Sequence, residues 1–140
     1  MDRKEQVIQK ASKIIQGQCN EKGYCALTLM DIDDCPNTTT ITPSKANGIQ
    51  SITFCTGYGT RTERIRFRPD ACVCFNSSEY HISLKGKMEI ITDPVAKREM
   101  WYLGLAEYFK GPDDPDYVVL KFTAKSYTLF IDGQTLRGLI

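Results

Sequence analysis

The first segment of the chain is amphipathic. Its apolar residues recur at helical spacing and form one stripe, made of Val7, Ile8, Ala11, Ile14 and Ile15. Asp2 is placed to cap a helix here, and Gly17 is placed to end it. The pattern predicts a helix over residues 2–18.

Most of the remaining chain shows the two-residue alternation and the β-branched content of strands. Strands are predicted over residues 24–30, 38–44, 50–56, 71–76, 80–91, 117–123 and 126–131. Asn47-Gly48 suits a tight hairpin turn. Two further helices are predicted: residues 60–68, ended by Pro69, and a helix that starts at Asp93-Pro94 and runs to about Phe109.

These elements give a mainly β protein with flanking helices. Strands that pair mainly with their sequence neighbours close most economically as an antiparallel barrel. The chain has no internal repeat, no low-complexity tract and no composition shift that marks a boundary. We therefore expect one domain spanning residues 1–140.

Charge and hydropathy narrow the class of partner. The chain has 18 basic and 17 acidic residues and a formal charge of +1, so no overall field favours nucleic acid. No apolar run approaches the ~20 residues needed to cross a membrane, and the charged N-terminus lacks the apolar core of a signal peptide. A cytoplasmic protein that binds neither nucleic acid nor membrane is expected.

Six cysteines are the most unusual feature of the composition. Without an export signal, reduced thiols are expected rather than disulfides. Cys72 and Cys74 lie two residues apart, which is not the spacing of a zinc site, and the chain has a single histidine. We predict no metal site and treat the cysteines as small buried hydrophobes.

The stretch from Ser51 to Pro69 carries the clearest candidate chemistry. An alternating strand runs into a Thr/Gly turn and then into a helix start, where Thr60 can cap and Arg61 follows. Free N–H groups, a helix dipole and an arginine fork favour a phosphate at such a place. The alternative is a capped surface helix with ordinary solvated arginines.

Four stretches together resemble a known family. They are residues 40–45 (TITPSK), 54–65 (FCTGYGTRTERI), 81–91 (HISLKGKMEII) and 101–117 (WYLGLAEYFKGPDDPDY). The chain resembles the pyridoxamine 5'-phosphate oxidase-like proteins, which bind FMN, and most of all their short general stress protein branch. The resemblance implies a six- to seven-stranded antiparallel split β-barrel with flanking helices.

The resemblance also implies a cofactor site. In such proteins the FMN phosphate would meet the hydroxyls of Thr56 and Thr60 and the guanidinium of Arg61, with Lys45 as a second cation. Residues 40–44 would lie along the isoalloxazine edge, and His81 would reach the flavin of the other subunit. The implied cofactor-binding residues are Thr40, Ile41, Thr42, Pro43, Ser44, Lys45, Cys55, Thr56, Thr60, Arg61, Thr62 and His81.

The chain departs from the family pattern at three points. Thr62 stands where relatives commonly have Lys, which would remove one cation from the phosphate site, so Thr62→Lys is expected to restore it. Thr40 stands where the true oxidases have a basic residue. Only DGQTLRGLI follows the last predicted strand, without the oxidases' substrate-holding segment. These departures argue against pyridoxamine phosphate as the substrate.

The leading functional interpretation is an FMN-dependent oxidoreductase of unknown substrate. It would be a homodimer with FMN at the subunit interface, and it would use a small-molecule electron donor and acceptor. No Ser/His/Asp set is present, and flavin chemistry needs none. One alternative is a non-catalytic flavin-binding stress-response module. Another is a haem-binding relative with His81 as axial ligand, which the single histidine makes weaker.

Overall fold

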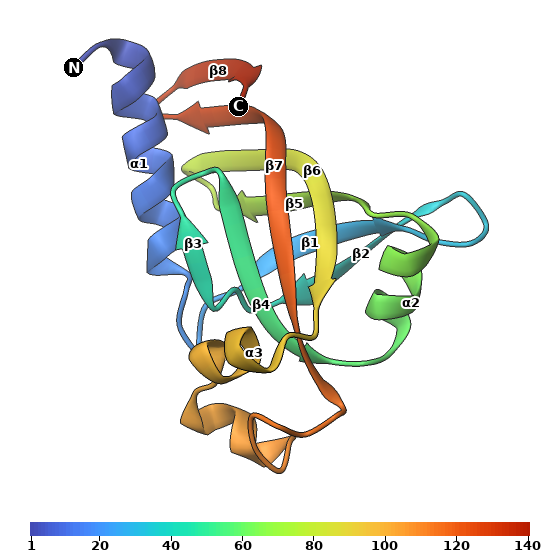
Figure 1. Cartoon of the computed structure of the whole chain (residues 1–140). Coiled ribbons are helices and arrows are strands. Elements are labelled where there is room, and N and C mark those ends of the chain that lie inside the picture. Colours follow the sequence, from blue (N-terminus) through green and yellow to red (C-terminus); the bar gives the residue numbers. More distant parts are fainter.

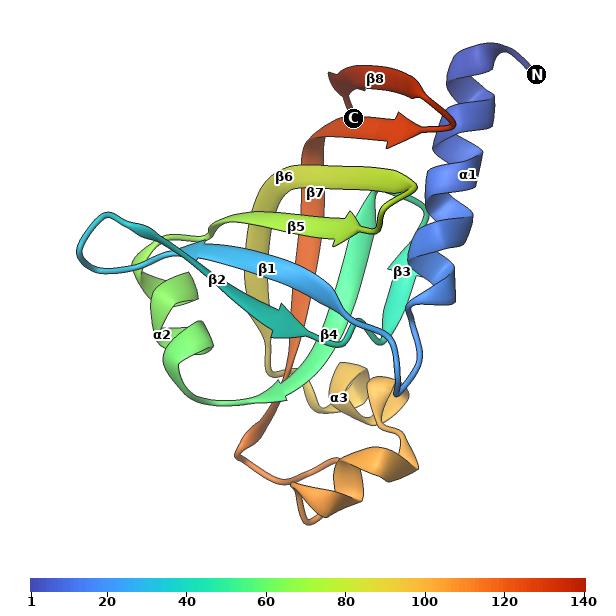
Figure 2. The ribbon, with the colours of Figure 1, turned by 180° about the vertical axis from the view of Figure 1, so that it is seen from behind.

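The computed structural model describes residues 1–140, and its strands form one curled antiparallel sheet with helices around it (Figures 1 and 2). The strands are β1 (Cys25–Met30), β2 (Pro36–Ile41), β3 (Lys45–Asn47), β4 (Ser51–Gly57), β5 (Asp70–Asn76), β6 (Tyr80–Ile91), β7 (Tyr117–Ile131) and β8 (Gln134–Leu139). The helices are α1 (Arg3–Gly17), α2 (Thr60–Phe67), α3 (Pro94–Met100) and the 3-10 helix Leu103–Glu107. The predicted mainly β, antiparallel split-barrel class is confirmed.

The sheet order is β2-β1-β5-β6-β7-β4-β3, and β8 adds to β7. The long β6–β7 pair bends at a bulge between Lys85 and Gly86. A Cβ at Gly86 would lie 2.0 Å from the Thr123 carbonyl oxygen, so only glycine lets the two backbones approach here. This bend lets one pair of strands serve both ends of the barrel.

The core lies inside the curled sheet, where alternate residues of each strand point inward. Leu27, Phe54, Val73, Leu84 and Phe122 are among its fully buried members. The apolar stripe of α1 joins the same cluster, and this helix packs against β3 and β7. Figures 1 and 2 show α1 on one side of the barrel and α2, which packs on β1 and β6, on the opposite side.

The predicted helix from residue 94 to about 109 is wrong in its second half. Helix α3 ends at Met100, Trp101 adopts extended dihedrals, and a 3-10 turn follows. The Trp101 ring packs edge-on against Tyr117 with 5.3 Å between ring centroids. Packing on this buried tyrosine therefore outweighs continuation of the helical stripe.

Other strand predictions also differ from the structure. The predicted strands 117–123 and 126–131 form one continuous strand, because Ala124 stays in the barrel wall and its N–H donates to the Gln50 carbonyl. The predicted strand 38–44 ends at Ile41. Strand β8 was not predicted; it turns back at Asp132-Gly133, where both residues have positive φ. No helix is both long and apolar enough to cross a membrane.

Candidate functional site

The junction between β4 and α2 begins at Gly57 and ends at Thr60. The N-cap residue of α2 is Gly59, so the predicted capping role of Thr60 is wrong. Thr62 stabilises the junction instead. Its Oγ1 accepts from the Gly59 N–H at 2.9 Å and donates to the Gly59 carbonyl at 2.8 Å.

A hollow of about 560 Å³ lies at this junction, and we call it the β4–α2 hollow. It is lined from three elements by Asn37, Thr39, Thr56, Gly57, Tyr58, Gly59, Thr60, Arg61 and Arg64. Three of the predicted phosphate contacts, Thr56, Thr60 and Arg61, thus lie on one hollow. No carboxylate lines it, so two guanidinium groups set its charge.

Arg61 joins α2 to the outermost strand of the sheet. Its Nη2 donates to the Thr40 carbonyl at 2.8 Å, and its Nε donates to Thr39 Oγ1 at 3.3 Å. Burial lowers the pKa of the Arg61 guanidinium and neighbouring Arg64 lowers it further, yet arginine stays charged at neutral pH. The N–H groups of Nη1 have no protein partner and are available to a ligand.

Arg64 is the site residue that the sequence analysis missed. It lies three residues after Arg61 and therefore on the same face of α2. Its Nη2 donates to Asp31 Oδ2 at 3.0 Å, and its side chain is only 14% exposed. Hydrogen bonds from the Ile32 N–H and from Arg64 lower the pKa of Asp31, so this carboxylate stays charged.

The Nε of Arg64 is buried and has no hydrogen-bond partner in the protein. An unpaired buried donor on a charged group is costly, and such groups usually have a function or an unseen partner. Arg64 lines the β4–α2 hollow, so its positive charge favours an anion there, although the Nε itself is closed to solvent. The sequence signal for Arg64 is its spacing from Arg61.

Thr62 does not line the hollow. Its side chain is 1% exposed, and its hydroxyl already has both partners on Gly59. A residue at this position points toward the core, as Ile65 does one turn later. A lysine here would therefore have to leave the core to reach the hollow, and the expectation that Thr62→Lys restores a phosphate contact does not fit this geometry.

The predicted flavin-edge stretch divides at the end of β2. Ile41 is buried in the core, whereas Thr40 is exposed. Thr42, Pro43, Ser44 and Lys45 line a second hollow of about 440 Å³, with Met100 and Tyr102 on its far wall. We call this the β2–β3 hollow.

His81 lies apart from both hollows, and Cys55 lies next to the β2–β3 hollow without lining it. The Sγ of Cys55 is 3.5 Å from the Met100 carbonyl and 3.7 Å from the Tyr117 hydroxyl, and burial raises the pKa of this thiol. His81 is exposed on β6, and its Nδ1 contacts the Asn76 side-chain oxygen. One chain therefore does not bring His81 together with Arg61.

Comparison with known proteins places these features in a family. The family model described as "Pyridoxamine 5'-phosphate oxidase" matches residues 11–130. No curated protein sequence matches the chain.

Solved structures similar to this chain have the same fold. A Clostridium acetobutylicum protein related to general stress protein 26 of Bacillus subtilis has a TM-score of 0.85 at 23% identity, covering 100% of this chain and 97% of its own. An FMN-binding, pyridoxamine 5'-phosphate oxidase-related protein from Nostoc punctiforme has a TM-score of 0.71 at 13% identity, and the match covers 100% of this chain and 98% of that protein. A heme-binding protein from Mycobacterium smegmatis has a TM-score of 0.68 at 15% identity, and the match covers 92% of this chain and 57% of that protein.

Proposed function

The chain belongs to the pyridoxamine 5'-phosphate oxidase family, and from this premise we propose that it is an FMN-binding flavoprotein with oxidoreductase activity. The observation that carries the proposal is the β4–α2 hollow, where two arginines and three threonines meet without a carboxylate on the wall. Because the flavin carries the redox chemistry, the protein needs only to bind and orient it.

The donor set of this hollow fits the phosphate of FMN. A phosphate has three acceptor oxygens and a double negative charge, and guanidinium groups match it with paired N–H donors. Arg61 offers its Nη1 donors, and Arg64 adds a second guanidinium charge to the same hollow. Thr56 and Thr60 would add hydroxyl donors.

The isoalloxazine ring would extend from this phosphate along residues 40–44, toward the β2–β3 hollow. Ile41 would contribute only through its backbone, since its side chain is in the core. Lys45 and Tyr102 would then lie beside the ring and any substrate. FMN, when bound, supplies electron transfer between a small-molecule donor and acceptor.

We further propose that the protein is a homodimer with FMN at the interface. The support is the position of His81, which lies outside both hollows in its own chain. Only a second copy could bring this side chain to the flavin. A reducing, cytoplasmic location accords with six free thiols and belongs to the same proposal.

The test is a titration of apoprotein with FMN and with riboflavin, which lacks the phosphate. The proposal requires tighter binding of FMN, by at least tenfold, and a flavin absorption spectrum in the reconstituted protein. Equal affinities for the two flavins would refute the phosphate site.

Haem and the non-catalytic module are the competing outcomes. A haem spectrum after reconstitution, with no uptake of FMN, would favour the haem alternative, in which exposed His81 would be the ligand. Tight FMN binding without any bleaching of the flavin by reduced nicotinamides would favour the non-catalytic module.

A further inference from the structure

A pair of thiols lies on the outer face of β5. Along this strand Ala71, Val73 and Phe75 point into the core, so Cys72 and Cys74 point outward and are half-buried. Their sulfur atoms are 3.8 Å apart. The Sγ of Cys72 is also 3.5 Å from Ser83 Oγ on the neighbouring strand β6.

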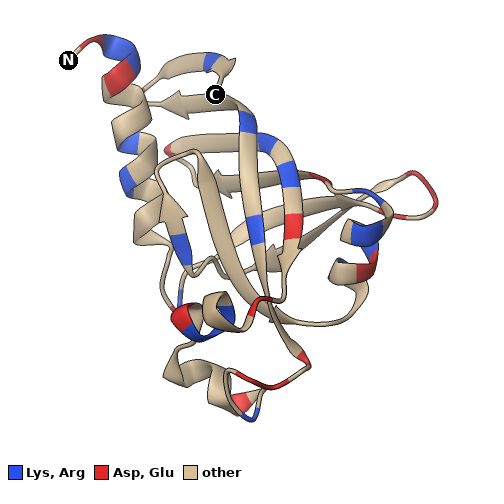
Figure 3. Ribbon diagram, in the orientation of Figure 1, with Lys and Arg blue, Asp and Glu red and all other residues tan.

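Cys72 also lines a hollow of about 410 Å³ that we call the lysine hollow. Three ammonium groups lie on its wall: Lys85 and Lys87 from β6 and Lys125 from β7. Figure 3 shows the blue segments of these two strands side by side. The only carboxylate on the wall, Asp70, is engaged by Lys87 at 3.3 Å and by Arg68 at 3.5 Å.

These neighbours favour the thiolate form of Cys72. A hydrogen bond from the Cys74 thiol is the largest effect, and with Ser83, Lys85 and His81 it lowers the pKa of Cys72 to about 6 against the opposing effect of burial. The same hydrogen bond raises the pKa of Cys74, which keeps its proton. From β1 the hollow receives only Thr28, Leu29 and Met30, which do not titrate.

The two thiols are poorly placed to form a disulfide with each other. The Cα atoms of residues two apart on a strand are separated by roughly 6.6 Å. Their Cβ atoms point the same way, so the Cβ atoms are about as far apart as the Cα atoms. A disulfide needs Cβ atoms about 3.8 Å apart and sulfurs at ~2.05 Å. The Cys72 sulfur therefore remains free for an external partner.

We propose that Cys72 is a site of thiol–disulfide exchange with an anionic low-molecular-weight disulfide, which the lysine hollow holds in place. The Cys72 thiolate attacks one sulfur of the disulfide, and a new S–S bond forms as the old one breaks. The other half of the disulfide leaves as a thiolate, so the Cys72 sulfur is oxidised and the leaving sulfur is reduced. The lysine hollow shares no lining residue with the β4–α2 hollow or the β2–β3 hollow, so this site is distinct from the two that the proposed FMN site uses.

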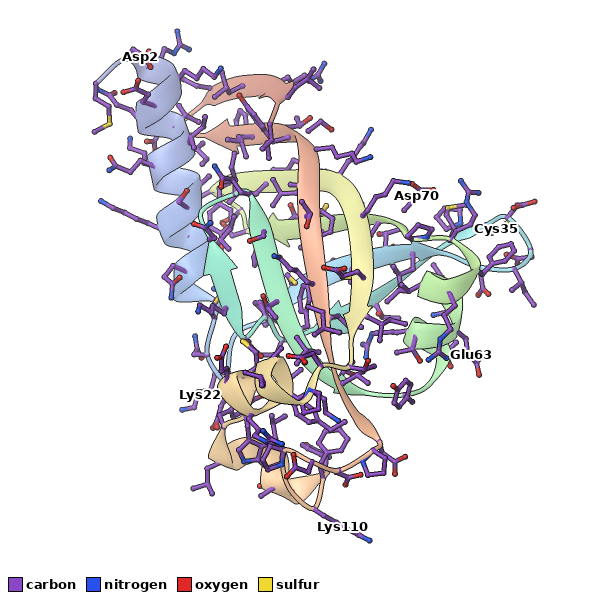
Figure 4. All side chains as sticks on the ribbon, viewed as in Figure 1. Asp2, Lys22, Cys35, Glu63, Asp70 and Lys110 are labelled. Atoms are coloured by element: carbon purple, nitrogen blue, oxygen red, sulfur yellow. The ribbon has the colours of Figure 1, made fainter.

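The chain supplies its own control thiol. Cys35 is exposed in the loop between β1 and β2 (Figure 4) and does not line the lysine hollow. It should react as an ordinary exposed thiol, without help from neighbouring ammonium groups. The two sites can be followed separately in the variants Cys35→Ser and Cys72→Ser.

The experiment treats native protein with glutathione disulfide and locates the adduct by mass spectrometry. Rates are then compared for the anionic probe 5,5'-dithiobis(2-nitrobenzoate) and the cationic probe cystamine. In Cys35→Ser, we expect a rate that stays level from pH 9 to about pH 7, and at least a tenfold preference for the anionic probe. Lys85→Gln combined with Lys125→Gln should remove most of that preference while the melting temperature stays unchanged.

In Cys72→Ser, the remaining reaction at Cys35 should not prefer the anionic probe. An adduct confined to Cys35 would overturn the proposal. So would a Cys72 that reacts only after unfolding, or one whose rate is not level between pH 7 and pH 9.

Discussion

Replacing Arg61 by alanine separates a phosphate contact from a structural clamp. The guanidinium binds β2 through the Thr40 carbonyl at 2.8 Å and Thr39 Oγ1 at 3.3 Å. It also lines the β4–α2 hollow with donors that no protein group uses. Arg61→Ala therefore removes two protein contacts and one predicted ligand contact at once.

The loss of the two protein contacts affects the stability of the fold, whereas the loss of the predicted ligand contact affects only FMN binding. Hydrogen bonds to a charged group contribute roughly 1.5–3 kcal/mol, but the half-exposed position of Arg61 and the length of the Thr39 contact reduce its share of stability to about 1 kcal/mol. Loss of a phosphate contact should cost a further ~1.5–3 kcal/mol of FMN binding, a factor of roughly 10 to 150 in Kd. Riboflavin binding should change by less than about threefold.

Fluorescence titration of the apoprotein with each flavin, together with urea unfolding, measures both quantities. The control variant is Arg66→Ala on the same helix, whose guanidinium lies over the Tyr58 ring and does not line the hollow. It should leave the affinities for both flavins unchanged. Equal loss of FMN and riboflavin affinity in Arg61→Ala would show that Arg61 acts only as a clamp, and the phosphate argument would then be refuted.

Four further outcomes follow from the structure. Arg64→Gln should weaken FMN binding at least fivefold and leave riboflavin unaffected in the same titration, because it removes one of the two guanidinium charges from the hollow. Thr62→Lys should lower the unfolding free energy by about 1–3 kcal/mol in urea and fail to tighten FMN binding, since the site is 1% exposed. Gly86→Ala should cost at least ~2 kcal/mol in the same assay, whereas Gly111→Ala, which has no atom within 4 Å of its new methyl, should stay within about 0.5 kcal/mol. Tyr117→Phe should cost about 1 kcal/mol by calorimetry, because its buried hydroxyl donates to the Lys97 carbonyl at 2.9 Å.

The elements that the sequence predicts well are those whose pattern has one interpretation. The α1 stripe fits only a helix, and the alternation in β4 and β5 fits only strands with one buried face. The segment after Pro94 fails this condition. Its apolar residues suit one long helix by spacing, but contact with Tyr117, which lies far along the chain, decides where the helix stops.

Strand β8 shows a different kind of failure. Asp132-Gly133 is a hairpin signal in the sequence, although no strand is predicted after it. In the structure both residues adopt positive φ and turn the chain back onto β7. An Asp-Gly pair directly after a strand pattern therefore indicates a returning strand.

The candidate site shows why residue type alone misleads on a short helix. The pattern TRTERI has two inward positions, Thr62 and Ile65, and two outward positions, Arg61 and Arg64. The resemblance drew attention to Thr62 as the place where a cation is missing, but the helix turns that position toward the core. The spacing of three between the arginines puts both guanidinium groups on the hollow, so the second cation of the proposed phosphate site is present one turn along the helix from Arg61.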